Sequence, residues 1–291
     1  MTLDTISTAD SKGVGAREAM TAQPPERPHF ERPPILEQAI SLSFERLMSF
    51  DLVDFGLFWN RVKDQFPTNE TGARFIAPIE GFEEINTPIS FTLMGPVELP
   101  RSLLRNDQGE LIQVQDDSFG FNWIKPSPES DYPRFEQTSA RLWDLYSTFL
   151  KYLEERGHGQ PAFRQCELTN VNLIPVQDFG RDFSDMTDAF VVDPFEWKVE
   201  GLVAETYVRR RQHKIVDADG RPAGRLHSVI SPVFRNQEKA FQFELTARSP
   251  PTIRTENDAK AFFEQAHRMI NKAFWVSVTP KMRKFWGEYD G

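Results

Sequence analysis

Apolar side chains recur with two different spacings along this chain, and each spacing predicts one kind of element. From Ile35 to Phe44 apolar and polar residues largely alternate, which predicts a strand with one buried face. Between residues 55 and 66 apolar side chains return every three or four positions, which predicts a helix that stops at Pro67. Shorter apolar runs predict further strands at residues 89–93, 112–114, 119–123, 166–173, 202–216, 223–234 and 241–245.

Two long amphipathic segments predict the main helices. Residues 135–153 carry one apolar stripe and are followed by Gly157, a residue type that commonly ends helices. Residues 259–274 carry the other stripe, behind a variant capping box formed by Thr255 and Asp258. Each segment follows a Phe-x-Phe strand and a proline-containing stretch. The sequence therefore predicts an α+β fold of two related units, each an antiparallel sheet covered by a long amphipathic helix.

Composition divides the chain into three parts. Residues 1–33 are rich in Thr, Ala, Ser and then Pro, and they hold too few apolar side chains to offset the entropy cost of ordering them. They are predicted to form a disordered, proline-rich leader, with Phe30 as the expected anchor if this leader docks on a partner. Residues 34–157 and 158–291 are predicted to form an N-terminal and a C-terminal α+β unit.

Charge and cysteine content indicate the cellular compartment of the protein. The 291 residues include 34 basic and 43 acidic side chains, for a formal charge of −9, and one cysteine, Cys166. No apolar run is long enough to cross a membrane, and the first residues lack the pattern of a secretory signal. A single cysteine excludes internal disulfides and favours a reducing compartment. We therefore expect a cytoplasmic protein with no membrane partner.

One arrangement of charged residues fits catalysis. Asp193, Glu196 and Lys198 resemble the carboxylate and Glu-x-Lys pattern of metal-dependent nucleases, in which the acids hold Mg²⁺ and the lysine helps to activate water. Such a short pattern also arises by chance, and Pro194 interrupts the strand that it needs. The chain has no phosphate-binding glycine loop, no nucleophile elbow and no metal-ligand spacing of His or Cys. No cofactor or metal is predicted, and a metal-dependent nuclease or hydrolase is the alternative to a non-enzymatic role.

Polar residues within apolar segments supply candidate binding groups. Asn122 and Asn172 either satisfy backbone groups or line a ligand pocket between the sheets, with Trp123 as a stacking wall. His267 lies at the edge of the last apolar stripe, where it is either a partly buried core residue or a general base. A small-ligand sensor is the second alternative function.

The densest basic run contains Arg209 and Arg211, which share one face of a predicted strand. The net charge of −9 opposes non-specific binding to a phosphate backbone, so nucleic acid is not an expected partner. Charged residues on a strand also discourage pairing between sheet edges. The run is therefore interpreted as a solvated strand edge, which an acidic protein partner could also contact.

Several sequence blocks occur in a recognisable order and spacing. They are residues 34–40, residues 115–123 with Tyr132-Pro133-Arg134-Phe135 after them, residues 168–174, and residues 263–274. In this order the blocks resemble a sporadically distributed family of uncharacterised prokaryotic proteins of similar length, and the Phe-Asn-Trp…Tyr-Pro block is the most specific. This chain has Asn170 where many members have an aromatic residue. The resemblance implies no established activity, and the patchy distribution of the family implies an association with mobile elements or defence.

The leading hypothesis is a non-enzymatic, cytosolic protein-binding component. It would act as the neutralising or accessory partner in a defence or toxin–antitoxin system. Because the chain is acidic, a basic protein is the partner that its charge suits. The sequence does not define the oligomeric state.

Overall fold

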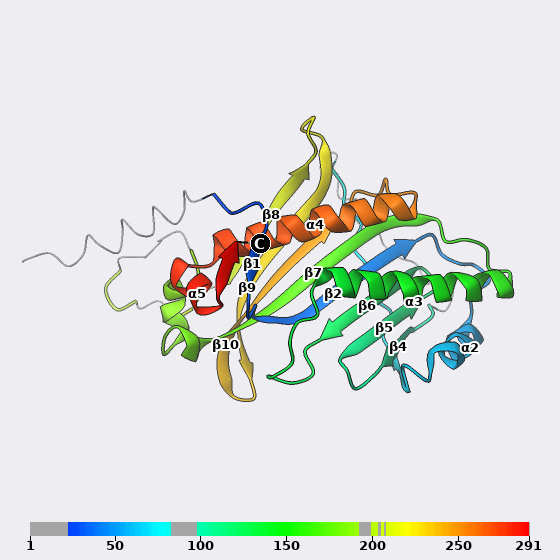
Figure 1. Ribbon diagram of the computed structural model, residues 1–291, viewed down its shortest axis with the longest axis horizontal. Helices are drawn as coiled ribbons and strands as arrows, with labels where there is room; N and C mark the ends of the chain where they lie inside the picture. Colours follow the sequence, from blue (N-terminus) through cyan, green and yellow to red (C-terminus); the bar gives the residue numbers. More distant parts are fainter. Residues whose placement is uncertain (1–22, 83–97, 192–198, 203–204, 207, 291) are drawn as a thin grey trace, which may run out of the picture.

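A large antiparallel sheet forms the centre of the molecule (Figure 1). The computed structural model describes residues 23–82, 98–191, 199–202, 205–206 and 208–290. Within these ranges nine strands pair in the order β3-β4-β5-β6-β2-β7-β10-β9-β8. The strands are β2 (Ile35–Phe44), β3 (Thr68–Gly72), β4 (Arg101–Arg105), β5 (Glu110–Gln115), β6 (Ser118–Ile124), β7 (Phe163–Pro175), β8 (Arg209–Val216), β9 (Pro222–Arg235) and β10 (Glu238–Arg248).

Two long helices, α3 (Phe135–Arg156) and α4 (Glu256–Ser277), lie on the same face of this sheet (Figure 1). They run antiparallel, since the ring of Phe135 stacks on His267 at 4.2 Å while Trp143 lies 6.2 Å from Phe263. The shorter helices α2 (Leu52–Val62) and α5 (Pro280–Phe285) lie toward opposite ends of the sheet. Two short 3-10 helices, η1 (Val176–Asp178) and η2 (Phe183–Asp188), follow β7. The fold is therefore mixed α+β, as predicted.

Alternation of apolar residues divides the sheet into two faces. On the helix-covered face, Leu168 and Phe243 are fully buried. We call the opposite face the helix-free face, because none of the helices within the described ranges covers it; there Glu37, Thr169 and Glu244 are half-buried. This pattern follows from the period of two along a strand, because neighbouring residues point to opposite faces.

Local signals in the sequence set several element boundaries. The capping box predicted at Thr255 and Asp258 is present at the start of α4. The first helix begins a little earlier than its apolar repeat indicated, because the side chain of Asp51 caps it. Pro280, which follows the end of α4, occupies the first turn of α5, a position that needs no backbone N–H.

Two predicted strands include residues that the structure does not describe. The strand expected at residues 89–93 lies outside the described residues. Of the strand expected at residues 202–216, the part from Arg209 forms β8. It turns back into β9 across Asp217 to Gly220, a stretch rich in turn-forming residues.

The start and end of the described chain pair with each other. Strand β1 (Pro28–Phe30) is antiparallel to β11 (Glu288–Asp290). Phe30 is buried, with its ring centroid 5.5 Å from that of Phe274 and 6.2 Å from that of Trp286. The sequence placed residues up to 33 in the leader, whereas the structure gives residues 28–30 to a strand. The ring of Phe30 thus packs within its own chain.

The N-terminal and C-terminal halves share one sheet rather than forming separate layers. Strands β2 and β7 pair antiparallel at its centre, with Ile40 opposite Leu168. Among the described residues, no helix is both long and apolar enough to span a lipid bilayer.

Candidate functional site

The residues of the predicted nuclease pattern cannot be placed in the fold. Asp193, Glu196 and Lys198 all lie outside the described residues. Within the described part of the chain, no group of three or more His, Cys, Asp and Glu side chains is arranged to hold a metal ion.

Trp123 and His267 both lie on the helix-covered side. The ring of Trp123 packs against Tyr132 at 5.6 Å, and the Nε2 atom of His267 lies 3.0 Å from the side-chain amide of Asn271. Tyr132 and His267 also line a cavity of about 50 Å³. A space of this size accommodates about one or two water molecules. His267 thus lines a cavity that is small for a metabolite, and Trp123 packs against Tyr132, another residue of its lining.

Burial also fixes the charge state of His267. It lowers the pKa of the imidazole to about 4; Glu136 opposes this shift, while His29 and Arg268 add to it. The ring is therefore neutral at pH 7. A neutral ring stacked on Phe135 serves packing between α3 and α4.

The two predicted asparagines serve different faces of the sheet. The side chain of Asn172 donates to the backbone oxygen of Phe243 at 3.0 Å. Asn122 accepts from Gln113 at 2.7 Å and donates to Glu37 on the helix-free face. The structure therefore does not bring them into one pocket.

The predicted basic residues lie on the edge strand β8. Arg209 donates to the backbone oxygen of Val191 at 2.6 Å, which ties this edge to the loop after η2. Arg211 is exposed on the same face of β8. Neither residue lies beside Trp123 or the asparagines in the pairing order of the sheet.

Cys166 is fully buried on the helix-covered face of β7. Burial raises the pKa of its thiol, so the reactive thiolate is disfavoured. Cys166 therefore serves as a small core residue.

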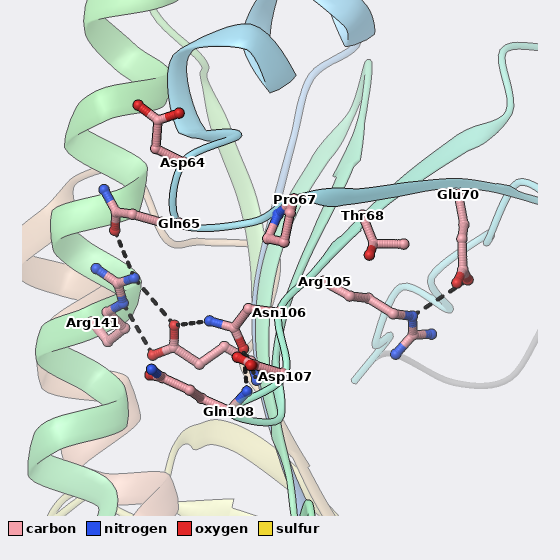
Figure 2. Close-up of a pocket in the computed structure, with 11 residues that line it drawn as sticks. Asp64, Gln65, Pro67, Thr68, Glu70, Arg105, Asn106, Asp107, Gln108 and Arg141 are labelled. Carbon is pink, nitrogen blue, oxygen red and sulfur yellow. Dashed lines mark hydrogen bonds and ion pairs between the residues drawn. The ribbon is translucent and has the colours of Figure 1, made fainter.

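An open hollow of about 720 Å³ lies between α3, the start of β3 and the turn between β4 and β5 (Figure 2). Arg141 bridges its wall, with 3.1 Å contacts to both carboxylate oxygens of Glu110 and a 2.8 Å bond to Gln65. Asn106 donates to the same carboxylate at 2.9 Å. These polar groups bind one another, so the hollow is lined by a satisfied network.

A chain of hydrogen bonds joins α2 to the end of α3. Ser49 lies 2.7 Å from Nδ1 of His158, whose Nε2 lies 2.9 Å from Asp54. The series has the residue types of a hydrolase triad, but the nitrogen that faces serine is Nδ1, and the same Asp54 oxygen also accepts from Tyr152 and Arg156.

Asp54 is the centre of this network. Burial alone would raise the pKa of its carboxyl, but hydrogen bonds from Tyr152, from the backbone of Asp51 and from His158 outweigh burial and hold the pKa below its usual value. A carboxylate held by so many donors is well suited to fastening α2 to α3.

One segment that carries no clear sequence signal crosses the helix-free face. We call residues 74–82 the strap. The amide of Gln115 accepts from the backbone N–H of Phe75 at 2.7 Å and donates to its oxygen at 2.9 Å. The amide of Gln165 accepts from the N–H of Glu80 and donates to the oxygen of Pro78, both at 2.9 Å. Both glutamines are almost fully buried.

Ion pairs fix the two ends of the strap. Arg74 contacts Asp116 at 2.5 Å and also Asp117, in the turn between β5 and β6. Glu80, only 5% exposed, meets three cationic or ionisable side chains of strands β9 and β10. They are Arg225, His227 at 2.6 Å and Arg248 at 3.4 Å.

The strap turns its charged side chains inward and its apolar ones outward. Phe75 is 48% exposed, Ile76 74% and Ile79 42%. This reverses the usual sorting of residues by polarity. No apolar periodicity marks the segment, which is why sequence patterns did not reveal it.

A second group of exposed apolar side chains covers the outer side of α2 and the loop before it. Its members are Met48, Leu52, Val53 and Leu57, and the first three are more than half exposed. Asp116 links this group to the strap, because Arg46, two residues before Met48, binds the same carboxylate as Arg74.

Comparison with known proteins adds no template for this site. The chain matches no protein-family model, no curated protein and no solved structure.

Proposed function

We propose that this protein acts by binding another protein, as the neutralising or accessory partner in a defence or toxin–antitoxin system. The observation that carries the proposal is the exposure of apolar side chains on α2, the loop before it and the strap, two groups linked through Asp116. We call the two groups together the apolar end; it consists of Met48, Leu52, Val53, Leu57, Phe75, Ile76 and Ile79.

Apolar side chains grouped in this way are typical of protein interfaces rather than of an ordinary surface. Single exposed apolar residues are common, but larger contiguous groups mark interaction sites. The two segments of the apolar end are held by the shared Asp116 carboxylate, so they are presented on a fixed frame.

Charge indicates the chemistry of the partner. The chain carries a formal charge of −9, and exposed acids such as Glu45 and Asp51 accompany the apolar side chains of α2. A basic protein with an apolar patch therefore complements this region. Nucleases and other nucleic-acid-directed toxins have this charge, which supports the neutralising role.

We also propose that residues 34–157 and 158–291 are two related units. The strand order β4-β5-β6-β2 on one side of the central pair is matched by β8-β9-β10-β7 on the other. In each half the last strand of the hairpin is followed by a long helix on the same face. A cytoplasmic location is also proposed, because the chain has a single cysteine, Cys166, which suits a reducing compartment.

The test is co-purification with the products of neighbouring genes. The tagged chain is co-expressed with each neighbouring product, and complex formation is read by size exclusion and native mass spectrometry. The double variant Leu52→Ser/Ile76→Ser is compared with Phe234→Ser, which alters a 68% exposed ring near the turn between β9 and β10.

We expect a complex with the wild-type chain and with Phe234→Ser, and its loss in the double variant. A chain that elutes alone with every neighbouring product contradicts the proposal. So does a complex that the two variants weaken equally.

A further inference from the structure

The strap is held mainly through its backbone, in the way that a protein binds a separate peptide chain. Buried side-chain amides of Gln115 and Gln165 each bind one N–H and one carbonyl of the strap backbone. Bonds of this kind require an extended chain but no particular side chain, because every non-proline residue offers the same two groups.

The side chains that anchor the strap belong to the sheet. Gln115 lies on β5, Gln165 on β7, and the two are linked across the sheet by the pairing of Ser118 with Ser43. Arg225 and Arg248 face each other on β9 and β10. The receptor groups are therefore placed by strand pairing, independently of the segment that they bind.

The charged side chains that anchor the strap set the spacing that a competing peptide would need. Arg74 reaches the Asp116 and Asp117 carboxylates, and Glu80, six positions later, reaches Arg225, His227 and Arg248. Six extended residues span about 20 Å. Arg225 also donates to the backbone oxygen of Gly81 at 2.9 Å, so the acidic end is held through both side chain and backbone.

The strap is poorly secured by apolar burial. Phe75, Ile76 and Ile79 are all more than 40% exposed, so hydrophobic transfer stabilises this segment far less than a core strand. Its attachment rests on polar contacts that another extended chain can reproduce.

We propose that the helix-free face is a peptide-binding site that residues 74–82 occupy in the isolated chain. Its external ligand is an extended segment of a partner protein with an arginine and, six positions later, a glutamate. This rests on the proposed protein-binding function and specifies where the partner inserts. The strap then acts as an internal competitor, and its displacement also changes the presentation of Phe75, Ile76 and Ile79.

Because the strap belongs to the same chain as its binding site, its competition with a free peptide can be predicted. A tethered segment has an effective concentration of about 1 mM or more, so the wild-type strap outcompetes a free peptide of equal affinity. Replacing the charged anchors of the strap should remove that advantage and leave the receptor groups intact.

The experiment measures binding of a fluorescein-labelled peptide, Gly-Ala-Arg-Phe-Ile-Ala-Pro-Ile-Glu-Gly-Phe, which has the sequence of residues 72–82. Fluorescence anisotropy compares the full-length wild type with the full-length variant Arg74→Ala/Glu80→Ala. We expect the variant to bind at least about tenfold more tightly, because it has lost both charge-assisted anchors of its competitor.

Two controls test the chemistry of the site. A peptide whose arginine and glutamate are replaced by alanine should not bind measurably to the variant. Adding Gln115→Ala and Gln165→Ala to the variant should abolish binding of the original peptide. Equal binding of both peptides, or binding that survives loss of both glutamines, overturns the proposal.

Hydrogen exchange of the wild type provides a measurement that does not depend on the variant folding. Excess peptide should accelerate exchange at the amides of Phe75 and Glu80, which displacement exposes. No acceleration at saturating peptide, or no binding by a folded variant, shows that the strap is a permanent part of the fold. The outcome of the co-purification test is separate from that result, because a partner can bind the exposed side chains of the apolar end whether or not it displaces the strap.

Discussion

The two faces of the central sheet use opposite means to hold what lies on them. On the helix-covered face, Phe243 is fully buried and its ring stacks on Phe274 of α4, with centroids 5.7 Å apart. On the helix-free face, the strap is held by amides and ion pairs, and its rings and branched side chains point away from the sheet. Apolar contact fixes the helices, while hydrogen bonds fix the strap.

The difference lies in how readily each attachment can be exchanged. A packed aromatic contact depends on the shape of both partners, so another segment rarely fits in its place. A backbone hydrogen bond or a carboxylate pair accepts any chain with the same groups. The helix-covered face is therefore suited to stability, and the helix-free face to recognition.

Neighbouring residues of β10 provide the sharpest contrast between the faces. Phe243→Ala should lower the free energy of unfolding by about 3–5 kcal/mol, because it removes a large buried ring. Glu244→Ala, one residue away on the opposite face, should change it by less than about 1 kcal/mol. Urea titration followed by fluorescence measures both. Similar losses in the two variants would show that the helix-free face is as tightly packed as the other.

The next-largest expected effect is the pH dependence of stability, which tests the packing of His267 between α3 and α4. The pKa of His267 is about 4 in the folded chain, against 6.5 for an unperturbed histidine. Between these values the unfolded chain binds the proton more readily, so stability should be complete above pH 6.5 and fall as pH drops toward 4. The difference corresponds to about 3 kcal/mol.

A matched variant separates this contribution from those of other groups. His267→Gln cannot titrate but retains an acceptor for Asn271. Urea titrations between about pH 4 and 7 should therefore show a shallower decline for the variant than for the wild type. Parallel curves would mean that the ring is not buried between α3 and α4.

A smaller effect is expected at the first turn of α4. Thr255→Ala removes the hydroxyl that accepts from the backbone N–H of Asp258 and should cost about 1 kcal/mol of stability. Thr255→Ser keeps the cap and serves as the control. Thermal unfolding of the three proteins checks the order, and an unchanged melting temperature for Thr255→Ala would show that the cap contributes nothing.

The smallest effect on stability belongs to the strap. Ile76 is 74% exposed, so Ile76→Ser should change the free energy of unfolding by less than about 0.5 kcal/mol. A loss above about 2 kcal/mol in urea titration would indicate that the outer side of the strap is packed in the folded protein.

The elements were more predictable than their arrangement. Alternation located β2 and β6, and a glycine located the end of α3, because these signals act within a few residues. The order of the strands was not accessible, because the central pairing of β2 with β7 joins residues far apart in the chain.

The candidate site was less predictable than the fold. Asn122, Asn172 and His267 were recognised as polar residues in apolar settings, yet each is satisfied locally by a neighbour. The strap escaped detection because Arg74 and Glu80 are charged residues in an aperiodic segment, which predicts an exposed loop. Their burial comes from partners on distant strands, and a single sequence does not reveal those partners.

The pairing of β1 with β11 makes the two ends of the described chain a clasp. Residues 28–30 and 288–290 lie side by side, with Phe30 wedged between α4 and the segment after α5. Trimming either short strand thus unfastens the other. With one spectroscopic label on β1 and one on β11, a single measured distance would report the separation of the two strands, whichever of them detaches first.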